Sequence, residues 1–211
     1  MRMRFFSIFI VVIFCSMLGT FLFGEGINPS VIALQEERVL QWRKKRDEFF
    51  KSHERSPLTS KEKENFKGLI YYPFNPKYVF IDQIKGYIFH INNPNYYVIF
   101  LPHKGTCERY IQCGKFNFNL NGKEYSIQVY ESILSETLFI PFKDMTNWRE
   151  THEGGRYIDS EILAGYKMVL DFNMAYNPPC AYNGKSVCVL PPKENVLNIN
   201  IQAGEKIFKS F

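Results

Sequence analysis

The spacing of apolar and polar positions divides the chain into three parts with different predicted structures. Residues 5–23 form an uncharged apolar run. Residues 28–51 carry apolar side chains at roughly helical spacing. From residue 77 onward the apolar positions fall into short runs bounded by Gly, Pro or Asn, which are typical of β-strands. The pattern therefore predicts a β-rich domain that follows a helical region.

The helical region is expected to hold one long and one short helix. Asn28-Pro29 can cap and start the long helix, and Ser56-Pro57 ends it because the residue before a proline avoids the α conformation. Thr59 and Glu62 have the spacing of a capping box. They predict a short second helix that ends near Gly68.

The strand region predicts a mainly β domain. Asn121-Gly122 is a strong signal for a two-residue hairpin turn between residues 116–120 and 124–130. Residues 156–171 are expected to form a second hairpin that turns at Ala164-Gly165. Further strands are predicted at residues 78–82, 87–91, 96–101, 137–142 and 196–201. We therefore expect residues 27–211 to form a single β-rich domain, an antiparallel β barrel or sandwich with the long and the short N-terminal helix packed against it.

Residues 1–26 are predicted to be a signal peptide or an N-terminal membrane anchor. Arg2 and Arg4 precede the apolar run of residues 5–23, as in the positively charged segment of an export signal. The run is close to the roughly 20 residues that a membrane-spanning helix needs. The sequence thus predicts an exported protein of the periplasm or cell envelope, with membrane association through residues 5–23.

The charge of the chain argues against nucleic acid as a partner. The first 24 residues hold two of the 26 basic residues and none of the 21 acidic ones, which leaves 24 basic against 21 acidic residues, a net charge of +3. The densest basic run, residues 43–46, is followed at once by Asp47 and Glu48, as on a solvated helix face. Arg46 lies on or beside the apolar stripe of the long helix, where an arginine either extends to solvent or reaches into a pocket.

Cysteine usage predicts disulfide bonds, because an even number of cysteines in an exported chain favours bridges. The short-range pairing joins Cys107 to Cys113 and Cys180 to Cys188. The spacings within these pairs do not match the C-x₂-C signature of zinc, so no metal site is predicted. A free Cys180 would need a histidine, brought to it by the fold, to act as a nucleophile. We favour the disulfides.

A candidate site lies in residues 154–192. Two Pro-Pro pairs remove backbone donors, so residues 173–192 are predicted to form a rigid loop, and loops on stiff scaffolds often carry function. Asp171 and Asn173 fall on the same side of a strand end. They either coordinate a ligand or bond the backbone of the loop itself.

Arg156, Asp171, Asn173 and Tyr176 are the predicted ligand-binding residues. In the expected hairpin, Arg156 and Asp171 face each other at the mouth of the loop. Arg156 then either pairs with Asp171 or presents its guanidinium to an anionic ligand. Tyr176 could stack on a sugar or an aromatic ligand.

Two classes of function fit these residues. The first is an exported cell-envelope module with a binding or structural role, whose partner is an unidentified small ligand or envelope component. The second is a hydrolase-like enzyme that uses Asp171 as general base, with Arg156 and Asn173 stabilising charge. Gly-rich phosphate-binding fingerprints, G-x-S-x-G and H-E-x-x-H are all missing from the sequence, so no cofactor is predicted. The lack of a recognisable nucleophile–base pair favours the first class.

Several motifs of the chain resemble one known family. GGRYID, VLDFNMAYNPPCAYN and IQAGEK resemble the bacterial family called domain of unknown function 1684. WRKKRDEFFK, SPLT, FKGLIYYP and LFIPFKDMTN fit the same family in the same order, so the resemblance covers roughly residues 38–207. Val189 stands where the family commonly has proline, and His152 stands where it commonly has tyrosine, which argues against a catalytic role for His152. The family has no assigned activity, so the resemblance implies no particular function.

Overall fold

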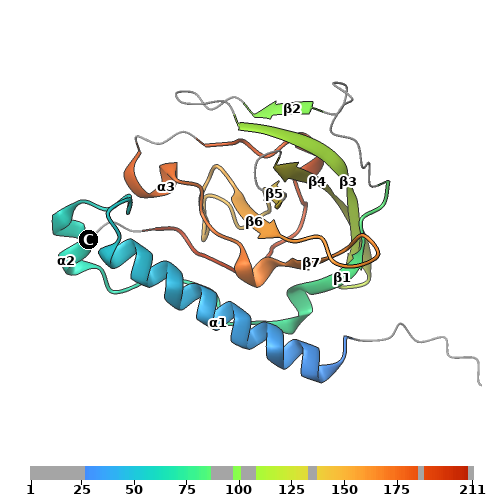
Figure 1. Cartoon of the computed structure of the whole chain (residues 1–211), viewed down its shortest axis with the longest axis horizontal. Helices are drawn as coiled ribbons and strands as arrows, with labels where there is room; N and C mark the ends of the chain where they lie inside the picture. The colour runs from blue at the N-terminus through green and yellow to red at the C-terminus, as the bar shows by residue number, and fades with distance from the viewer. Residues whose placement is uncertain (1–26, 87–96, 101–107, 133–136, 185–187, 209–211) are drawn as a thin grey trace, which may run out of the picture.

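The fold is mainly β, with antiparallel sheets and few helices, as the sequence predicts (Figure 1). The computed structural model describes residues 27–86, 97–100, 108–132, 137–184 and 188–208. Its strands form one five-stranded and one two-stranded sheet. Within these described ranges neither sheet closes into a barrel.

The long helix α1 (Pro29–Ser52) begins as the sequence predicts. The side chain of Asn28 accepts a hydrogen bond from the backbone N–H of Ser30 at 2.9 Å, and proline takes the first helical position, where no intrahelical N–H bond is lost. Figure 1 shows α1 running along one side of the strands. Gln35, Val39 and Phe50 are its buried residues, so one face of the helix covers the domain.

The short helix α2 (Ser60–Asn65) begins with the predicted capping box. The Thr59 hydroxyl accepts from the Glu62 backbone N–H, and the Glu62 carboxylate accepts from the Thr59 backbone N–H at 2.8 Å. The helix ends at Asn65, before the expected end near Gly68.

The larger sheet has the strand order β2-β3-β4-β5-β6, so each strand pairs with its neighbour in sequence. Asn121 and Gly122 form the predicted hairpin turn between β3 and β4, with φ angles of 56° and 77°. The predicted strand at residues 87–91 lies outside the described residues. The strands of this sheet are β2 (Tyr97–Phe100), β3 (Glu108–Leu120), β4 (Lys123–Ser132), β5 (Leu138–Phe142) and β6 (Arg156–Ser160).

The smaller sheet pairs β1 (Val79–Gln83) with β7 (Lys167–Asp171), and it shows that the predicted hairpin over residues 156–171 is wrong. The chain does turn near Gly165, but β6 pairs with β5 and β7 pairs with β1. The other edge of β6 is occupied by Tyr176, whose backbone exchanges two hydrogen bonds of 2.9 Å with Tyr157. Tyr176 therefore holds the position opposite Tyr157 that the predicted hairpin gave to β7.

Both sheets contribute to one hydrophobic core. Met168 and Leu170 of β7 are fully buried in the same cluster as side chains from β3 to β6. Burial of this kind stabilises by about 25 cal/mol per Å² of apolar surface. The aliphatic and aromatic members with no measurable exposure include Phe116, Ile127, Leu138, Ile140 and Phe142.

The C-terminal segment is irregular, so the predicted strand at residues 196–201 is wrong. Leu197 donates to the Lys143 carbonyl at 2.8 Å and the Ile199 carbonyl accepts from Met145 at 3.0 Å, but no ladder extends from these bonds. Four short helical turns connect other parts of the described chain. They are η1 (Pro76–Tyr78), η3 (Phe172–Met174), α3 (Cys180–Asn183) and η4 (Lys193–Asn195).

Gly204 provides a test of how tightly the C-terminal segment packs. Its φ is +77°, and a Cβ there would lie 2.7 Å from the Phe172 carbonyl oxygen. Gly165 has a similar φ of +74°, but a Cβ there would meet nothing within 4 Å. Gly165→Ala is expected to cost only the strain of a left-handed residue, about 1 kcal/mol. Gly204→Ala should cost a further 1–3 kcal/mol or so from overpacking.

Urea denaturation of the wild type and the two variants measures these costs. Equal losses of unfolding free energy in both variants would contradict the close packing at Gly204.

Candidate functional site

Asp171 is a capping residue at the end of β7. One carboxylate oxygen accepts hydrogen bonds from the backbone N and the side-chain Nδ2 of Asn173, both at 2.8 Å, and the other accepts from Nε2 of Gln35 at 2.8 Å. The side chain is 2 % exposed. Burial raises the pKa of Asp171, and the bonds from Gln35 and Asn173 offset part of that rise. Both oxygens are thus engaged by the fold itself.

Asn173 joins η3 to an earlier segment of the chain. Its Oδ1 accepts from the backbone N of Asn75 at 2.9 Å, and its Nδ2 donates to the Asn75 carbonyl at 3.0 Å. Arg43 of α1 adds two bonds, from Nη2 to the Asn173 carbonyl at 3.0 Å and from Nη1 to the Tyr72 carbonyl at 2.9 Å. Residues 72–75 are therefore fixed against η3 by side-chain bonds.

Arg156 lies in a different network, so its predicted pairing with Asp171 is wrong. Its guanidinium is fully buried and donates to the carbonyls of Ala203 and Ile201, the latter at 3.0 Å. Its charge partner is Asp144, at 3.4 Å. Burial lowers the pKa of Arg156 and Asp144 raises it in part. The strand pairing explains the difference, because β6 and β7 belong to different sheets.

Tyr176 is also held apart from Asp171. Its hydroxyl donates to Asp159 at 2.8 Å, and its ring lies 5.0 Å from the guanidinium carbon of Arg46. Of the four predicted residues, the structure brings Asp171 and Asn173 into contact and places Arg156 and Tyr176 in separate networks.

A buried polar cluster around Glu205 was not predicted from the sequence. The Glu205 carboxylate is 1 % exposed and accepts from Nη2 of Arg46 at 2.9 Å, from the Tyr182 hydroxyl at 2.9 Å and from Nδ2 of Asn177 at 3.0 Å. Burial raises the pKa of Glu205, and Arg46 lowers it in part. Arg46 therefore reaches inward, the second of its two expected positions. Its place on the apolar stripe of α1 was the one sequence signal for this cluster.

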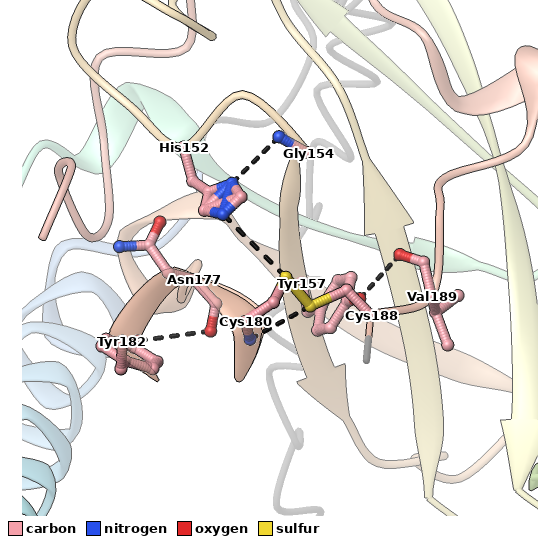
Figure 2. The surroundings of a disulfide bond; sticks show 8 residues. All are labelled: His152, Gly154, Tyr157, Asn177, Cys180, Tyr182, Cys188 and Val189. Carbon is pink, nitrogen blue, oxygen red and sulfur yellow. Dashed lines mark hydrogen bonds between the residues drawn. A yellow bond between two sulfur atoms is a disulfide. The ribbon is translucent and has the colours of Figure 1, made fainter. Parts of the chain in front are cut away.

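Cys180 and Cys188 are joined by a disulfide, and their Cα atoms lie 5.9 Å apart. Figure 2 shows the ring of His152 beside it. Nε2 of His152 is 4.0 Å from the sulfur of Cys180, and its Nδ1 accepts from the backbone N of Gly154 at 2.9 Å. The fold thus brings to Cys180 a histidine that is distant in sequence.

Cys113 is a free thiol among the described residues. The predicted Cys107–Cys113 disulfide stays a prediction, because Cys107 is not among them. Its side chain is fully buried in the core and donates to the Val129 carbonyl at 3.4 Å. Burial raises the pKa of the Cys113 thiol to about 12. Cys107 lies outside the described residues.

The surface has an open cleft of about 400 Å³. Its lining combines two lysines, one glutamate and aromatic rings, and it includes Tyr72, Lys77, Tyr78, Glu150, Gln202 and Lys206. Lys206 Nζ lies 4.5 Å from the centre of the Tyr72 ring and 3.9 Å from a carboxylate oxygen of Glu150. Asp171 and Arg156 do not line this cleft.

The described residues offer neither a metal-binding cluster nor a membrane-spanning helix. Within the described residues, no group of three or more His, Cys, Asp or Glu side chains could hold a metal ion. No helix in the same ranges is both long and apolar enough to cross a bilayer. The apolar run of residues 5–23 lies outside those ranges.

Comparisons with known proteins point to one family. The family model described as "Protein of unknown function (DUF1684)" matches residues 64–206. The fold is similar to the solution NMR structure of an uncharacterized protein from gene locus rrnAC0354 of Haloarcula marismortui. That similarity has a TM-score of 0.63 and 29% sequence identity, and it covers 84% of this chain and 96% of that one. No curated protein matches the chain.

Asp171→Asn tests the structural role of the Asp171 cap. We expect a loss of about 1–3 kcal/mol, because an amide nitrogen cannot accept the bond that Gln35 donates, whereas either oxygen of the Asp171 carboxyl group can accept it in both protonation states. The folded-state pKa of Asp171 is raised, so the contribution of this residue is complete below about pH 4 and declines as pH rises through the folded pKa. The loss caused by the substitution should therefore be largest in acid.

Denaturant midpoints at pH 4 and pH 7 measure this difference. Asp82→Asn, at an exposed position of β1, is the matched control and should change stability by less than about 0.5 kcal/mol. An unchanged midpoint for Asp171→Asn at both pH values would contradict the capping role.

Proposed function

We propose that this chain, which belongs to the family described as "Protein of unknown function (DUF1684)", is an exported cell-envelope module that binds a small anionic ligand. The observation that supports this is the open cleft lined by Tyr72, Glu150 and Lys206. Buried polar networks hold its walls from beneath. A site of this kind is concave, largely preformed and carries a few placed polar groups, as ligand sites do.

One wall of the cleft is formed by residues 72–78. Arg43 bonds the Tyr72 carbonyl and Asn173 bonds both backbone groups of Asn75. Asp171 in turn holds the side chain of Asn173. Asp171 and Asn173, two of the residues that the sequence singled out, therefore lie beneath the cleft and position this wall.

A second part of the lining, Gln202 and Lys206, comes from the C-terminal segment. Gln202 lies between Ile201 and Ala203, whose carbonyls both accept from Arg156. The Lys206 carbonyl accepts from Nδ2 of Asn177 at 2.8 Å. The backbone on both sides of Gln202 and at Lys206 is thus fixed by buried side chains, which limits the entropy that ligand binding would cost.

The charge of the cleft favours an anionic ligand. The cleft is lined by two lysines, Lys77 and Lys206, and by one carboxylate, that of Glu150. Lys77 Nζ lies 4.7 Å from the centre of the Tyr78 ring, and Lys206 lies similarly over Tyr72. Contacts between a cation and an aromatic face hold the two ammonium groups in place.

The hydrolase alternative has less support. A general base needs an accessible oxygen within reach of its substrate. Asp171 is 2 % exposed, both of its oxygens accept hydrogen bonds, and Arg156 is bonded to Asp144 instead. A binding role therefore accounts for the geometry better than catalysis at Asp171.

Lys206→Met tests the binding proposal. The protein is purified from its native source, and compounds released on denaturation are identified by mass spectrometry and then titrated back. Loss of the Lys206 ammonium should weaken binding about tenfold or more, since a hydrogen bond to a charged group contributes roughly 1.5–3 kcal/mol. Lys193→Met removes a lysine with a 92% exposed side chain and should leave binding unchanged.

Retention of the same compounds at the same affinity by both lysine variants would contradict binding in this cleft. So would a wild-type protein from which no small anion is released.

Export is the second part of the proposal, supported by the apolar run of residues 5–23 and by the Cys180–Cys188 disulfide. Fractionation of native cells, followed by mass spectrometry of the mature N-terminus, tests it. We expect a chain that is either cleaved near residue 26 or retained in the membrane fraction, with Cys180 protected from alkylation. A full-length chain in the cytosolic fraction with Cys180 open to alkylation would contradict it.

A further inference from the structure

The Cys180–Cys188 disulfide has polar hydrogen-bond donors at both sulfurs. The backbone N–H of Cys180 donates to the sulfur of Cys188 at 3.1 Å, and Nε2 of His152 lies 4.0 Å from the sulfur of Cys180. Both cysteines are half-buried, so the bond has partial access to solvent. Figure 2 shows the ring and the disulfide lying side by side.

The hydrogen bonding of His152 determines which ring nitrogen carries the proton. The backbone N–H of Gly154 donates to Nδ1, so Nδ1 is an acceptor, and the proton of the neutral ring is on Nε2. Nε2–H therefore points toward Cys180. Glycine at 154 leaves room for this arrangement, since a Cβ there would lie 3.1 Å from Cε1 of the ring.

The surroundings of His152 favour its neutral form. Burial lowers its pKa, Lys143 lowers it further, and Glu153 raises it in part. A neutral ring with its proton on Nε2 donates a hydrogen bond to sulfur, and this contact strengthens when the sulfur becomes an anion. The geometry is thus matched to a thiolate at Cys180 rather than only to a closed bridge.

We propose that Cys180–Cys188 is a redox-active disulfide that exchanges with dithiols, and that His152 stabilises the Cys180 thiolate released in that exchange. The reaction uses a dithiol reductant. Its first thiolate attacks the sulfur of Cys188, the bond between the two cysteine sulfurs breaks, and Cys180 leaves as a thiolate that accepts from Nε2–H.

The second thiol of the reductant then completes the exchange. As a thiolate it attacks the reductant's own sulfur in the mixed disulfide and releases Cys188. The reductant is oxidised to its disulfide, and its two electrons pass to the protein. Of the two protons that its thiols give up, one protonates Cys188 and the other goes to solvent, so that Cys180 stays a thiolate. Cys188 is released beside the Cys180 N–H, which can donate to it.

His152→Phe tests this role, because it keeps an aromatic ring and removes the donor. The protein is reduced with dithiothreitol, and alkylation of Cys180 is followed against pH by mass spectrometry of its peptide. In the wild type the midpoint should lie below the ordinary thiol pKa of about 8.5. In His152→Phe it should rise by about one unit, and reduction at neutral pH should slow several-fold, because a less stable thiolate leaves more slowly.

His53→Phe is the matched control. His53 accepts from the backbone N–H of Arg55 through Nδ1, as His152 does from Gly154, but it stacks on Phe49 at the end of α1. This variant should keep the wild-type midpoint and reduction rate. Cys113 does not interfere, because its thiol is buried and its peptide is separate.

Two outcomes would overturn the proposal. The first is a wild-type midpoint for Cys180 at or above the ordinary thiol value, which decides the question even if His152→Phe does not fold. The second is an equal midpoint and reduction rate in wild type and His152→Phe, as expected of a purely structural disulfide.

Discussion

The C-terminal segment needs hydrogen-bond partners for its buried backbone, and the structure depends on the side chains that supply them. Residues 197–206 form no strand, and isolated backbone bonds to residues 70, 72, 143, 145 and 175 satisfy only part of these groups. Asp144 accepts from the Ile201 N–H at 2.7 Å, and Arg156 donates to the carbonyls of Ile201 and Ala203. A fully buried ion pair thus bonds the backbone of Ile201 and Ala203, as a neighbouring strand would.

Such a buried ion pair fixes the position of the backbone that it bonds more than it raises the free energy of unfolding. Removing charges from water costs several kcal/mol per ion, and the attraction between them repays that cost only with good geometry and further hydrogen bonds. Arg156 and Glu205 each have several partners, so neither is left as an isolated charge. The buried polar networks fix residues 72–78 and the C-terminal segment, which line the cleft and belong mostly to no strand. A preformed binding site requires such a fixed lining.

The sequence was informative where structure is local. The capping box at Thr59, the cap at Asn28 and the turn at Asn121-Gly122 each depend on neighbouring residues, and each is present. The sequence was not informative where the partner is distant. The hairpin over residues 156–171 failed because Tyr176 occupies the edge of β6 that β7 was expected to take. No short-range pattern indicates that choice.

The same limit applies to the site. Asp171 and Asn173 were found because they are two residues apart, but their other partners, Gln35 and Asn75, are more than ninety positions away. Glu205 gave no signal, because a single carboxylate in a polar segment is ordinarily solvated. The sequence thus identified residues of the supporting layer, and only tertiary packing showed the cleft above them.

The proposed redox site and the proposed binding cleft are connected through a few hydrogen-bonded residues, yet we expect them to act independently. α3 carries both Cys180 and Tyr182, and Tyr182 bonds to Glu205, the neighbour of Lys206. The disulfide closes a loop with a sequence separation of 8, so its contribution lies below the ~3 kcal/mol of a 15-residue loop.

Tyr182 provides α3 with a second attachment that reduction does not remove. Its ring packs against Phe50 at 4.6 Å, and its hydroxyl donates to the Glu205 carboxylate beside Arg46. Burial of an aromatic side chain contributes about 1.5–3 kcal/mol, and a hydrogen bond to a charged group adds roughly as much again. The free energy that these contacts contribute exceeds the contribution of the loop closed by the disulfide. Opening the disulfide should therefore leave α3 and the cleft wall in place.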